Sequence, residues 1–263
     1  MKKSSFYSFS IALWSLLVLF TVASCKENEK VEPAEPIGIE ARDTANMWKA
    51  YYAGVTDAKD VQSSEVASNL LMISASNKDL VRDAEGRVLV ASWKSQRSST
   101  RLGFAANIGK EMEVPDMVWI TVAPQLKNIL KDHNLDSANL KVRVEQLLGL
   151  PPYGFSDRFI QLWVYPQDLF RPCPDSEISD NKCDTSFPAN VSADYKVLFE
   201  DIKKSTWGTG NDPQGFMPYP WTSLGYTYDW GVKKGHIGAS EFIVKKGAKV
   251  KVESITTTVA YFK

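Results

Sequence analysis

The spacing of apolar residues along this chain changes several times between the helical and the alternating pattern. In the segment 44–54, apolar residues recur at the spacing of one helical face, with Asp43 or Thr44 as the cap and Gly54 as the end. The segment 192–204 has the same spacing, and its two C-terminal lysines suit the negative end of a helix. Both segments are therefore predicted to be helices.

Other segments alternate apolar with polar residues, or are short and apolar throughout, as β-strands are. These predicted strands cover residues 66–73, 88–92, 118–122, 140–144, 159–164, 241–245 and 249–262. For the first of them, a helical turn is the alternative. The turn residues 83–86 predict a hairpin, and residues 95–101, rich in serine and arginine, are expected to form a solvated loop.

Two of these strands are followed by a proline and then by helical spacing. Pro124 precedes the segment 125–130, and Pro166 precedes the segment 167–170. Proline is tolerated in the first turn of a helix because its φ is fixed near −65° and it has no N–H to leave unpaired. Each proline is thus predicted to mark a corner between a strand and a helix.

Strands and helices are mixed without the regular strand-helix-strand spacing that a parallel sheet requires. We therefore expect residues 40–263 to form a single globular α+β domain, with a mainly antiparallel mixed sheet and a few short helices. Apolar residues make up 44% of the chain, which is enough for a well-packed core at this length.

The N-terminal segment 1–24 has the layout of a lipoprotein signal peptide. Two lysines precede a short apolar run at 11–20, and small residues lead to Cys25. The apolar run is too short to span a bilayer comfortably. Cleavage before Cys25 would leave a cysteine that carries acyl chains, which anchor a protein stably to a membrane. A plain secretory signal and an uncleaved anchor are the alternatives.

A lipidated cysteine predicts where the protein resides. We expect a lipid-anchored protein of the bacterial cell envelope, on its periplasmic or surface side, with membrane lipid as a partner through Cys25. Residues 25–39 are charged, contain prolines and have few apolar residues, so they are predicted to form a flexible tether. Of the 31 basic residues, two lie in the signal peptide; the remaining 29 against 31 acidic ones give a net charge of about −2, which disfavours nucleic acid as a partner.

Two further cysteines bracket a polar loop, and in an exported protein this favours a disulfide between Cys173 and Cys183. The loop carries several acidic residues, and oxygen-rich loops can bind calcium. Their spacing does not match a calcium-binding loop and includes no turn glycine, so we expect a solvated acidic loop, and neither a metal nor a cofactor. An acidic residue of the loop can instead pair with Arg171 or Lys182.

The segment 207–231 concentrates aromatic residues among glycines and prolines. Rigid rings beside a flexible backbone are typical of binding surfaces, where the rings stack on sugars or on peptide side chains. The candidates for such a surface are Trp207, Trp221, Tyr226, Tyr228 and Trp230. The alternative is that these rings fill a loop-rich part of the core, because aromatic residues dominate buried area.

A catalytic role has weaker support. The sequence contains no nucleophile elbow, zinc-protease motif or phosphate-binding loop. Of the two histidines, His236 is the better candidate for a base because it lies between glycines. Asp229 and Glu241 are carboxylates near it in sequence that could act as a glycosidase pair. We therefore expect a noncatalytic binding protein for a glycan or another envelope component. The alternative is a cell-envelope hydrolase that uses carboxylates on sugar or peptide polymers.

Overall fold

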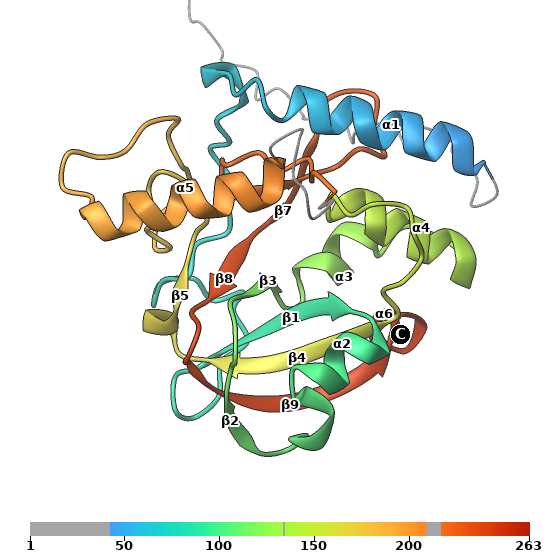
Figure 1. Cartoon of the computed structure of the whole chain (residues 1–263). Helices are drawn as coiled ribbons and strands as arrows, with labels where there is room; N and C mark the ends of the chain where they lie inside the picture. Colours follow the sequence, from blue (N-terminus) through green and yellow to red (C-terminus); the bar gives the residue numbers. More distant parts are fainter. Residues whose placement is uncertain (1–42, 134, 209–216) are drawn as a thin grey trace, which may run out of the picture. The chain divides into compact units, whose positions relative to one another are not determined.

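The computed structural model describes residues 43–133, 135–208 and 217–263 (Figure 1). The chain separates into two units after Pro33, and every described residue belongs to the second unit. The predicted signal peptide, Cys25 and the tether at 25–39 lie outside the described residues, and so do the first three residues of the predicted domain, 40–42. The middle of the aromatic segment, residues 209–216, also lies outside them.

Seven strands form one sheet in the order β2-β9-β4-β1-β3-β8-β5, and all neighbouring strands are antiparallel (Figure 1). A smaller sheet pairs β6 with β7. The strands are β1 (Val88–Lys94), β2 (Glu111–Glu113), β3 (Val118–Val122), β4 (Arg158–Val164), β5 (Leu169–Phe170), β6 (Tyr226–Tyr228), β7 (Ile237–Ser240), β8 (Phe242–Val244) and β9 (Lys249–Thr257). This arrangement confirms the predicted α+β fold with a mainly antiparallel sheet.

Six α-helices and three short 3-10 helices occur in the described part of the chain. They are α1 (Thr44–Asp57), α2 (Gln96–Arg101), α3 (Gln125–Leu130), α4 (Ser137–Leu147), α5 (Ala193–Trp207), α6 (Thr258–Phe262), η1 (Ser63–Glu65), η2 (Phe104–Ala106) and η3 (Pro166–Asp168). Most of the α-helices begin after a polar residue whose side chain accepts a hydrogen bond from a backbone N–H of the first turn. These caps explain where the helices start.

Three of the predicted helices are confirmed as α1, α5 and the helix α3 after Pro124. Helix α1 continues past Gly54 to Asp57 instead of ending at the glycine. Gly54 instead allows the helix to pack closely against Tyr228, because a Cβ at this position would lie 2.8 Å from the Tyr228 ring. Pro166 is the first residue of η3, which β5 follows directly, so the second predicted corner is a single 3-10 turn and not a longer helix.

The predicted strand at 140–144 was wrong, because this segment lies within α4. The Asp136 carboxylate caps the helix by accepting hydrogen bonds from two backbone N–H groups, at 3.0 and 2.8 Å. Val144 and Leu147 are then buried on one helical face, since residues three apart on a helix are neighbours. Over five residues the alternating pattern also fits part of a helix, and here the cap decides between them.

Two further boundaries differ from the prediction for the same reason. Residues 95–101 were expected to be a loop but form α2, because the Ser95 hydroxyl accepts a hydrogen bond from an N–H of the first turn at 3.1 Å. The predicted strand at 249–262 is β9 only as far as Thr257, whose side chain caps α6. In both places a capping hydroxyl starts a helix that apolar spacing alone does not indicate.

The segment 66–73 was predicted to be a strand, and the structure shows neither a strand nor a helix there. Its backbone pairs instead with the loop between the two cysteines. The Leu70 N–H donates to the Asn181 carbonyl at 2.8 Å, and the Ile73 N–H donates to the Ile178 carbonyl at 2.6 Å. The apolar side chains of this segment are thus buried beside an irregular loop and not within a sheet.

The two faces of the large sheet bury different side chains, because successive residues of a strand point to opposite faces. One face carries a continuous apolar core built from β1, β3, β4, β8 and β9. The other face carries two separate clusters. The first contains Trp93, Phe159 and residues of α3, α4 and α6, and the second contains Ile243, Trp221 and residues of α5. Helices α3, α4 and α5 lie on the same side of this sheet (Figure 1).

Candidate functional site

A cavity of about 350 Å³ lies over β1 and β3, bordered by residues of both clusters on the second face of the sheet. One wall comes from α3 and residues 148–150, and the opposite wall comes from the end of α5 and residues 219–221. Ala91, Trp93 and Trp119 line the cavity along the sheet face. Sites for small molecules have volumes of about 300–1,000 Å³ and are mostly apolar with a few polar groups. The cavity therefore matches a small-molecule site in size and character.

Glu241 lines this cavity at the point where the chain passes from the small sheet into the large one. It directly follows β7 and precedes β8, and its N–H donates to the Gly225 carbonyl at 3.0 Å. The register of β3 with β8 pairs Ile120 with Phe242, so Glu241 lies next to Thr121 one step further along. The change of sheet thus brings a carboxyl group onto an otherwise apolar face, and Glu241 is only 6% exposed.

Three buried polar atoms of the cavity lining have no hydrogen-bond partner among the described residues. They are Glu241 Oε1, Trp221 Nε1 and Thr121 Oγ1, and each of the three residues is less than a tenth exposed. A buried polar group without a partner costs about 1–3 kcal/mol, so native proteins contain few of them. Three such atoms lie around one cavity, where water or a ligand can reach them.

The carboxyl of Glu241 is held in its protonated form by its surroundings. Burial raises its pKa to about 8, from an ordinary value of 4.5. The Trp221 indole opposes part of this rise, which places its N–H near the carboxyl, although the two do not reach hydrogen-bond geometry. At pH 7 the carboxyl is mainly protonated and can both donate and accept a hydrogen bond.

Four other hydroxyls of the lining are engaged within the protein. The hydroxyls of Ser92, Thr206 and Thr227 each donate to a backbone carbonyl, at 2.6 to 2.8 Å. The hydroxyl of Tyr228 donates to the Asp57 carboxylate at 2.8 Å. Because these groups already have partners, the polar chemistry of the cavity rests on the three unpartnered atoms.

Lys94 borders the cavity at the end of β1, but the charged groups that act on its ammonium lie outside the cavity. Burial and the neighbouring Arg101 lower the pKa of Lys94, whereas Asp116 raises it. Neither Arg101 nor Asp116 lines the cavity. The alternation of the strand also directs the Lys94 side chain to the face opposite that of Trp93. Among the described lining residues, Glu241 is therefore an acid without a basic partner.

Asp229, a second candidate carboxylate, does not line the cavity and has a structural partner. It is 3% exposed and forms two hydrogen bonds with the Arg143 guanidinium, one of them at 2.9 Å. The same carboxylate accepts the Gly231 N–H at 2.9 Å. This bidentate pair joins α4 to the loop after β6, so Asp229 and Glu241 do not come together as a catalytic pair.

His236 lies at a second, smaller cavity of about 200 Å³. Its ring stacks on the ring of Tyr228 with centroids 4.5 Å apart, and its Nδ1 lies 3.0 Å from the Asp229 carbonyl oxygen. Tyr226 and Glu65 also line this second cavity. The structure thus separates the three residues considered for catalysis: Glu241 lines the larger cavity, His236 the smaller one, and Asp229 neither.

The predicted aromatic surface at 207–231 is largely internal. Trp221, Tyr226, Tyr228 and Trp230 are at most 5% exposed, and Trp207 is half-buried. Two of them, Trp221 and Tyr228, nevertheless line the larger cavity.

The other rings of this segment support that arrangement. Trp207 donates its Nε1–H to the Trp221 carbonyl at 2.8 Å, and Trp230 donates its Nε1–H to the Leu150 carbonyl at 3.0 Å. Tyr219, at 38% exposed, also lines the cavity and forms part of its rim. The aromatic segment therefore contributes a cavity wall instead of an outward-facing platform.

The exposed aromatic rings lie elsewhere, on α1 and on the loop after α4. Tyr52, Tyr153 and Phe155 are 46%, 45% and 70% exposed. Trp48 contacts Tyr52 and Tyr153, and Tyr153 stacks on Phe155 with centroids 4.9 Å apart. Sequence reasoning placed the first of these rings on a buried helical face and did not consider the others. It also read the cavity floor at Trp119 and Thr121 only as a strand.

The disulfide between Cys173 and Cys183 is confirmed. Its loop wraps around Arg171, which is completely buried. The guanidinium donates to the Asp180 carboxylate at 2.6 Å and to the backbone carbonyls of Lys182 and Asp180, both at 2.8 Å. The predicted pairing of Arg171 with an acidic residue of the loop is therefore present, and backbone carbonyls of the loop and of Leu71 accept further hydrogen bonds from the guanidinium.

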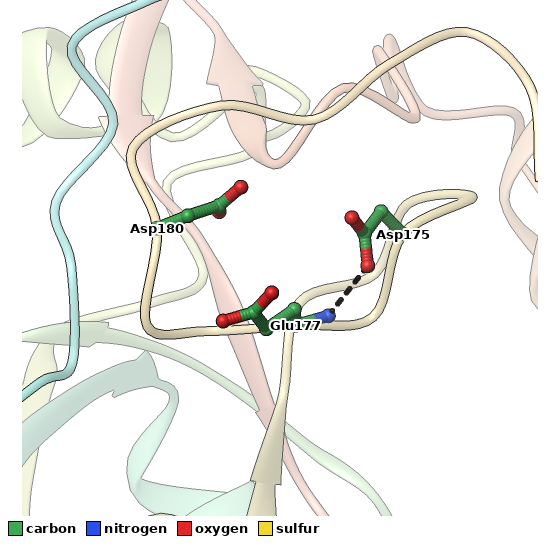
Figure 2. Close-up of side chains that lie close together, drawn as sticks. All are labelled: Asp175, Glu177 and Asp180. Carbon is green, nitrogen blue, oxygen red and sulfur yellow. Dashed lines mark hydrogen bonds between the residues drawn. The ribbon is translucent and has the colours of Figure 1, made fainter. Parts of the chain in front are cut away.

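Three carboxylates of the same loop lie close together, as Figure 2 shows for Asp175, Glu177 and Asp180. One oxygen of each lies within 4.8 Å of those of the other two. Asp180 already pairs with Arg171, and Asp175 accepts the Glu177 N–H at 3.2 Å. These contacts explain why the carboxylates lie close together: Asp180 neutralises Arg171, and Asp175 holds the turn of the loop.

Comparisons of the chain with models of protein families, with curated proteins and with solved structures find no match. Among the described residues, none of the helices combines the length and the apolar character needed to cross a bilayer.

Proposed function

We propose that this protein is a lipid-anchored envelope protein whose folded domain binds a small ligand, without catalysis, in the cavity around Glu241. The observation that carries this proposal is the set of three buried, unpartnered polar atoms on one cavity, those of Glu241, Trp221 and Thr121. The placement in the envelope rests on the signal-peptide pattern that ends at Cys25.

A ligand would gain binding energy from both the polar and the apolar parts of the cavity. Each polar atom that gains a hydrogen bond regains part of a desolvation cost of about 1–3 kcal/mol. The apolar part of a ligand would lie against Trp93, Trp119 and Leu126, and every Å² of apolar area that leaves water adds about 25 cal/mol. A few directed hydrogen bonds in a mostly apolar cavity provide both specificity and affinity.

A hydrolase that works with two carboxylates has less support in this geometry. Such enzymes hold their two carboxyl groups on either side of the bond that is cleaved, about 5 to 9.5 Å apart. Among the described residues that line the cavity, Glu241 supplies a single carboxyl, and Asp229 is engaged with Arg143. Binding is therefore the function that this arrangement favours.

Matched removal of two hydroxyls tests the proposal. Thr121→Val removes the unpartnered hydroxyl inside the cavity, and Thr256→Val removes an unpartnered hydroxyl that does not line it. Binding of a panel of monosaccharides, small amines and neutral aromatic alcohols would be measured on the mature protein by calorimetry. For any panel member that binds, Thr121→Val should weaken binding by about twofold to tenfold, the worth of one hydrogen bond, while Thr256→Val leaves it unchanged. Equal effects of both variants, or no binding by any member, would refute the proposal.

A further inference from the structure

We propose that the ligand of this cavity is a small organic cation, whose ammonium group pairs with Glu241 and whose apolar part lies against the surrounding indole rings. This inference rests on the proposed binding function and narrows it to one chemical class. It follows from the charge of the cavity, the geometry of its aromatic rings and the protonation of Glu241.

The first support is the missing counter-charge. A buried carboxylate is costly unless a basic group pairs with it, and natural proteins almost always supply one. Asp229, a carboxylate that is 3% exposed, follows that rule because it pairs with Arg143. Glu241 differs from Asp229, because no basic side chain of the described lining is directed at its carboxyl and burial keeps that carboxyl protonated. A cationic ligand would supply the partner that the protein lacks.

The second support is the arrangement of aromatic rings. Cations bind favourably over the faces of tryptophan and tyrosine rings, and cages of such rings recognise ammonium groups. Trp93, Trp119, Trp221 and Tyr219 all line the cavity. The rings of Trp119 and Trp221 stand at 85° to each other with centroids 6.2 Å apart, so they form a corner, and the Trp221 indole lies near the carboxyl. A neutral ligand could use one such wall, but a corner of two indoles next to an unpaired acid suits a cation.

The third support is testable: binding of a cation should depend on pH in a direction that follows from the protonation of Glu241. In the protein alone the carboxyl is protonated at neutral pH, because burial raises the pKa of Glu241 to about 8. A bound cation requires the carboxylate, so the carboxyl O–H bond breaks and one proton leaves to solvent as the ion pair forms. Consider a cation that does not itself titrate. As the pH increases toward the pKa of Glu241, its affinity should rise about tenfold per pH unit, and above that pKa the affinity should level off. A neutral ligand that binds the protonated acid should show the opposite trend.

The other titratable groups near Glu241 do not produce this signature. Tyr219 and Tyr228 line the same cavity, and Glu241 itself contributes to the raised pKa of the neighbouring Tyr226. Burial raises the pKa of all three phenols, so they stay neutral between pH 6 and 9. Lys94 is the remaining titratable residue of the lining, and the charges that act on it are those of Arg101 and Asp116.

Pairs of probes that differ only in charge provide the test. Choline would be compared with its uncharged carbon analogue 3,3-dimethylbutan-1-ol, and phenethylamine with 2-phenylethanol. Calorimetry on the mature protein in detergent, from pH 6 to 9 and in two buffers of different ionisation enthalpy, yields both the affinity and the number of protons released. The variants are Glu241→Gln and, as a matched control, Glu145→Gln. Glu145 is another buried acid with a raised pKa, of about 7, and it does not line the cavity.

Each outcome decides a different claim. We expect the cations to bind at least tenfold more tightly than their analogues at pH 8.5, with close to one proton released at pH 6.5. Glu241→Gln should lose both effects and Glu145→Gln should keep them. Neutral probes that bind as well as the cations would overturn the cation inference and leave the small-ligand function standing, whereas a failure of all four probes to bind would overturn this inference. If Glu241→Gln does not fold, the comparison of charged and neutral probes on the unaltered protein still decides the question.

Discussion

Replacing Glu241 by Gln should change how the stability of the protein depends on pH. The side chain keeps its shape and its capacity for hydrogen bonds, but it no longer takes up or releases a proton. In the native state burial raises the pKa of Glu241 to about 8, whereas the unfolded chain has the ordinary value of 4.5. The native state therefore binds the proton more strongly, and the unaltered protein should lose stability as the pH rises through this window.

The size of the effect follows from the width of the window. Each pH unit over which only the native state holds the proton costs about 1.4 kcal/mol. Between pH 4.5 and about 8 this amounts to a loss on the order of 4 kcal/mol for the unaltered protein relative to Glu241→Gln. No discount for solvent screening is needed, because Glu241 is only 6% exposed. A domain of this kind has about 5–15 kcal/mol of stability in total, so the loss is readily measured.

Urea unfolding at pH 5, 6.5 and 8, followed by tryptophan fluorescence, would measure the free energy of unfolding of both proteins. The two should have similar stability at pH 5, and Glu241→Gln should be the more stable by several kcal/mol at pH 8. Other titrating groups affect both proteins alike and cancel in the comparison. Parallel curves over the whole pH range would show that burial does not hold Glu241 in its protonated form.

Three further predictions concern the lipid anchor, the disulfide and the buried ion pair between Arg143 and Asp229. Cys25→Ala should abolish labelling of the protein by a palmitate analogue in growing cells; a label that persists would exclude lipidation at this residue. Replacing Cys173 and Cys183 together by serine should lower the free energy of unfolding by about 2–3 kcal/mol, the entropy of a loop of this size, and unchanged urea midpoints would contradict this. Arg143→Met should cost about 3–5 kcal/mol because it leaves the buried Asp229 unpaired, and adding Asp229→Asn should restore part of the loss if the pair is what matters.

The sequence allowed the α+β fold and several elements to be predicted, because their signals are local. The strands β1, β3, β4 and β8 are short apolar runs between turn residues, and α5 combines helical spacing with a serine cap. The disulfide was predictable from two cysteines that bracket one polar loop. The segment at 140–144 failed because five residues of alternating character fit one face of a helix as well as a strand. There the Asp136 cap outweighs the alternation.

The candidate site could be predicted only in part. Glu241 and Trp221 were both singled out from the sequence, but for separate roles, and Thr121 was read only as part of a strand. Their meeting depends on the strand order, which places β8 beside β3 although more than a hundred residues separate them along the chain. No local pattern encodes this order. Nor does any local pattern distinguish the paired carboxylate of Asp229 from the unpaired one of Glu241.

The indole N–H of Trp221 tests the central claim most directly, because it is buried at the cavity and has no hydrogen-bond partner among the described residues. Its signal in a proton-nitrogen correlation spectrum, assigned with Trp221→Phe, would be followed during titration with the tightest-binding probe. The Nε1–H of Trp163, already bonded to Glu253 at 2.6 Å outside the cavity, serves as the internal control. If the cavity is a ligand site, the Trp221 signal should shift on binding while the Trp163 signal stays in place. A Trp221 signal that stays in place while a bound probe saturates the protein would contradict the assignment of the site.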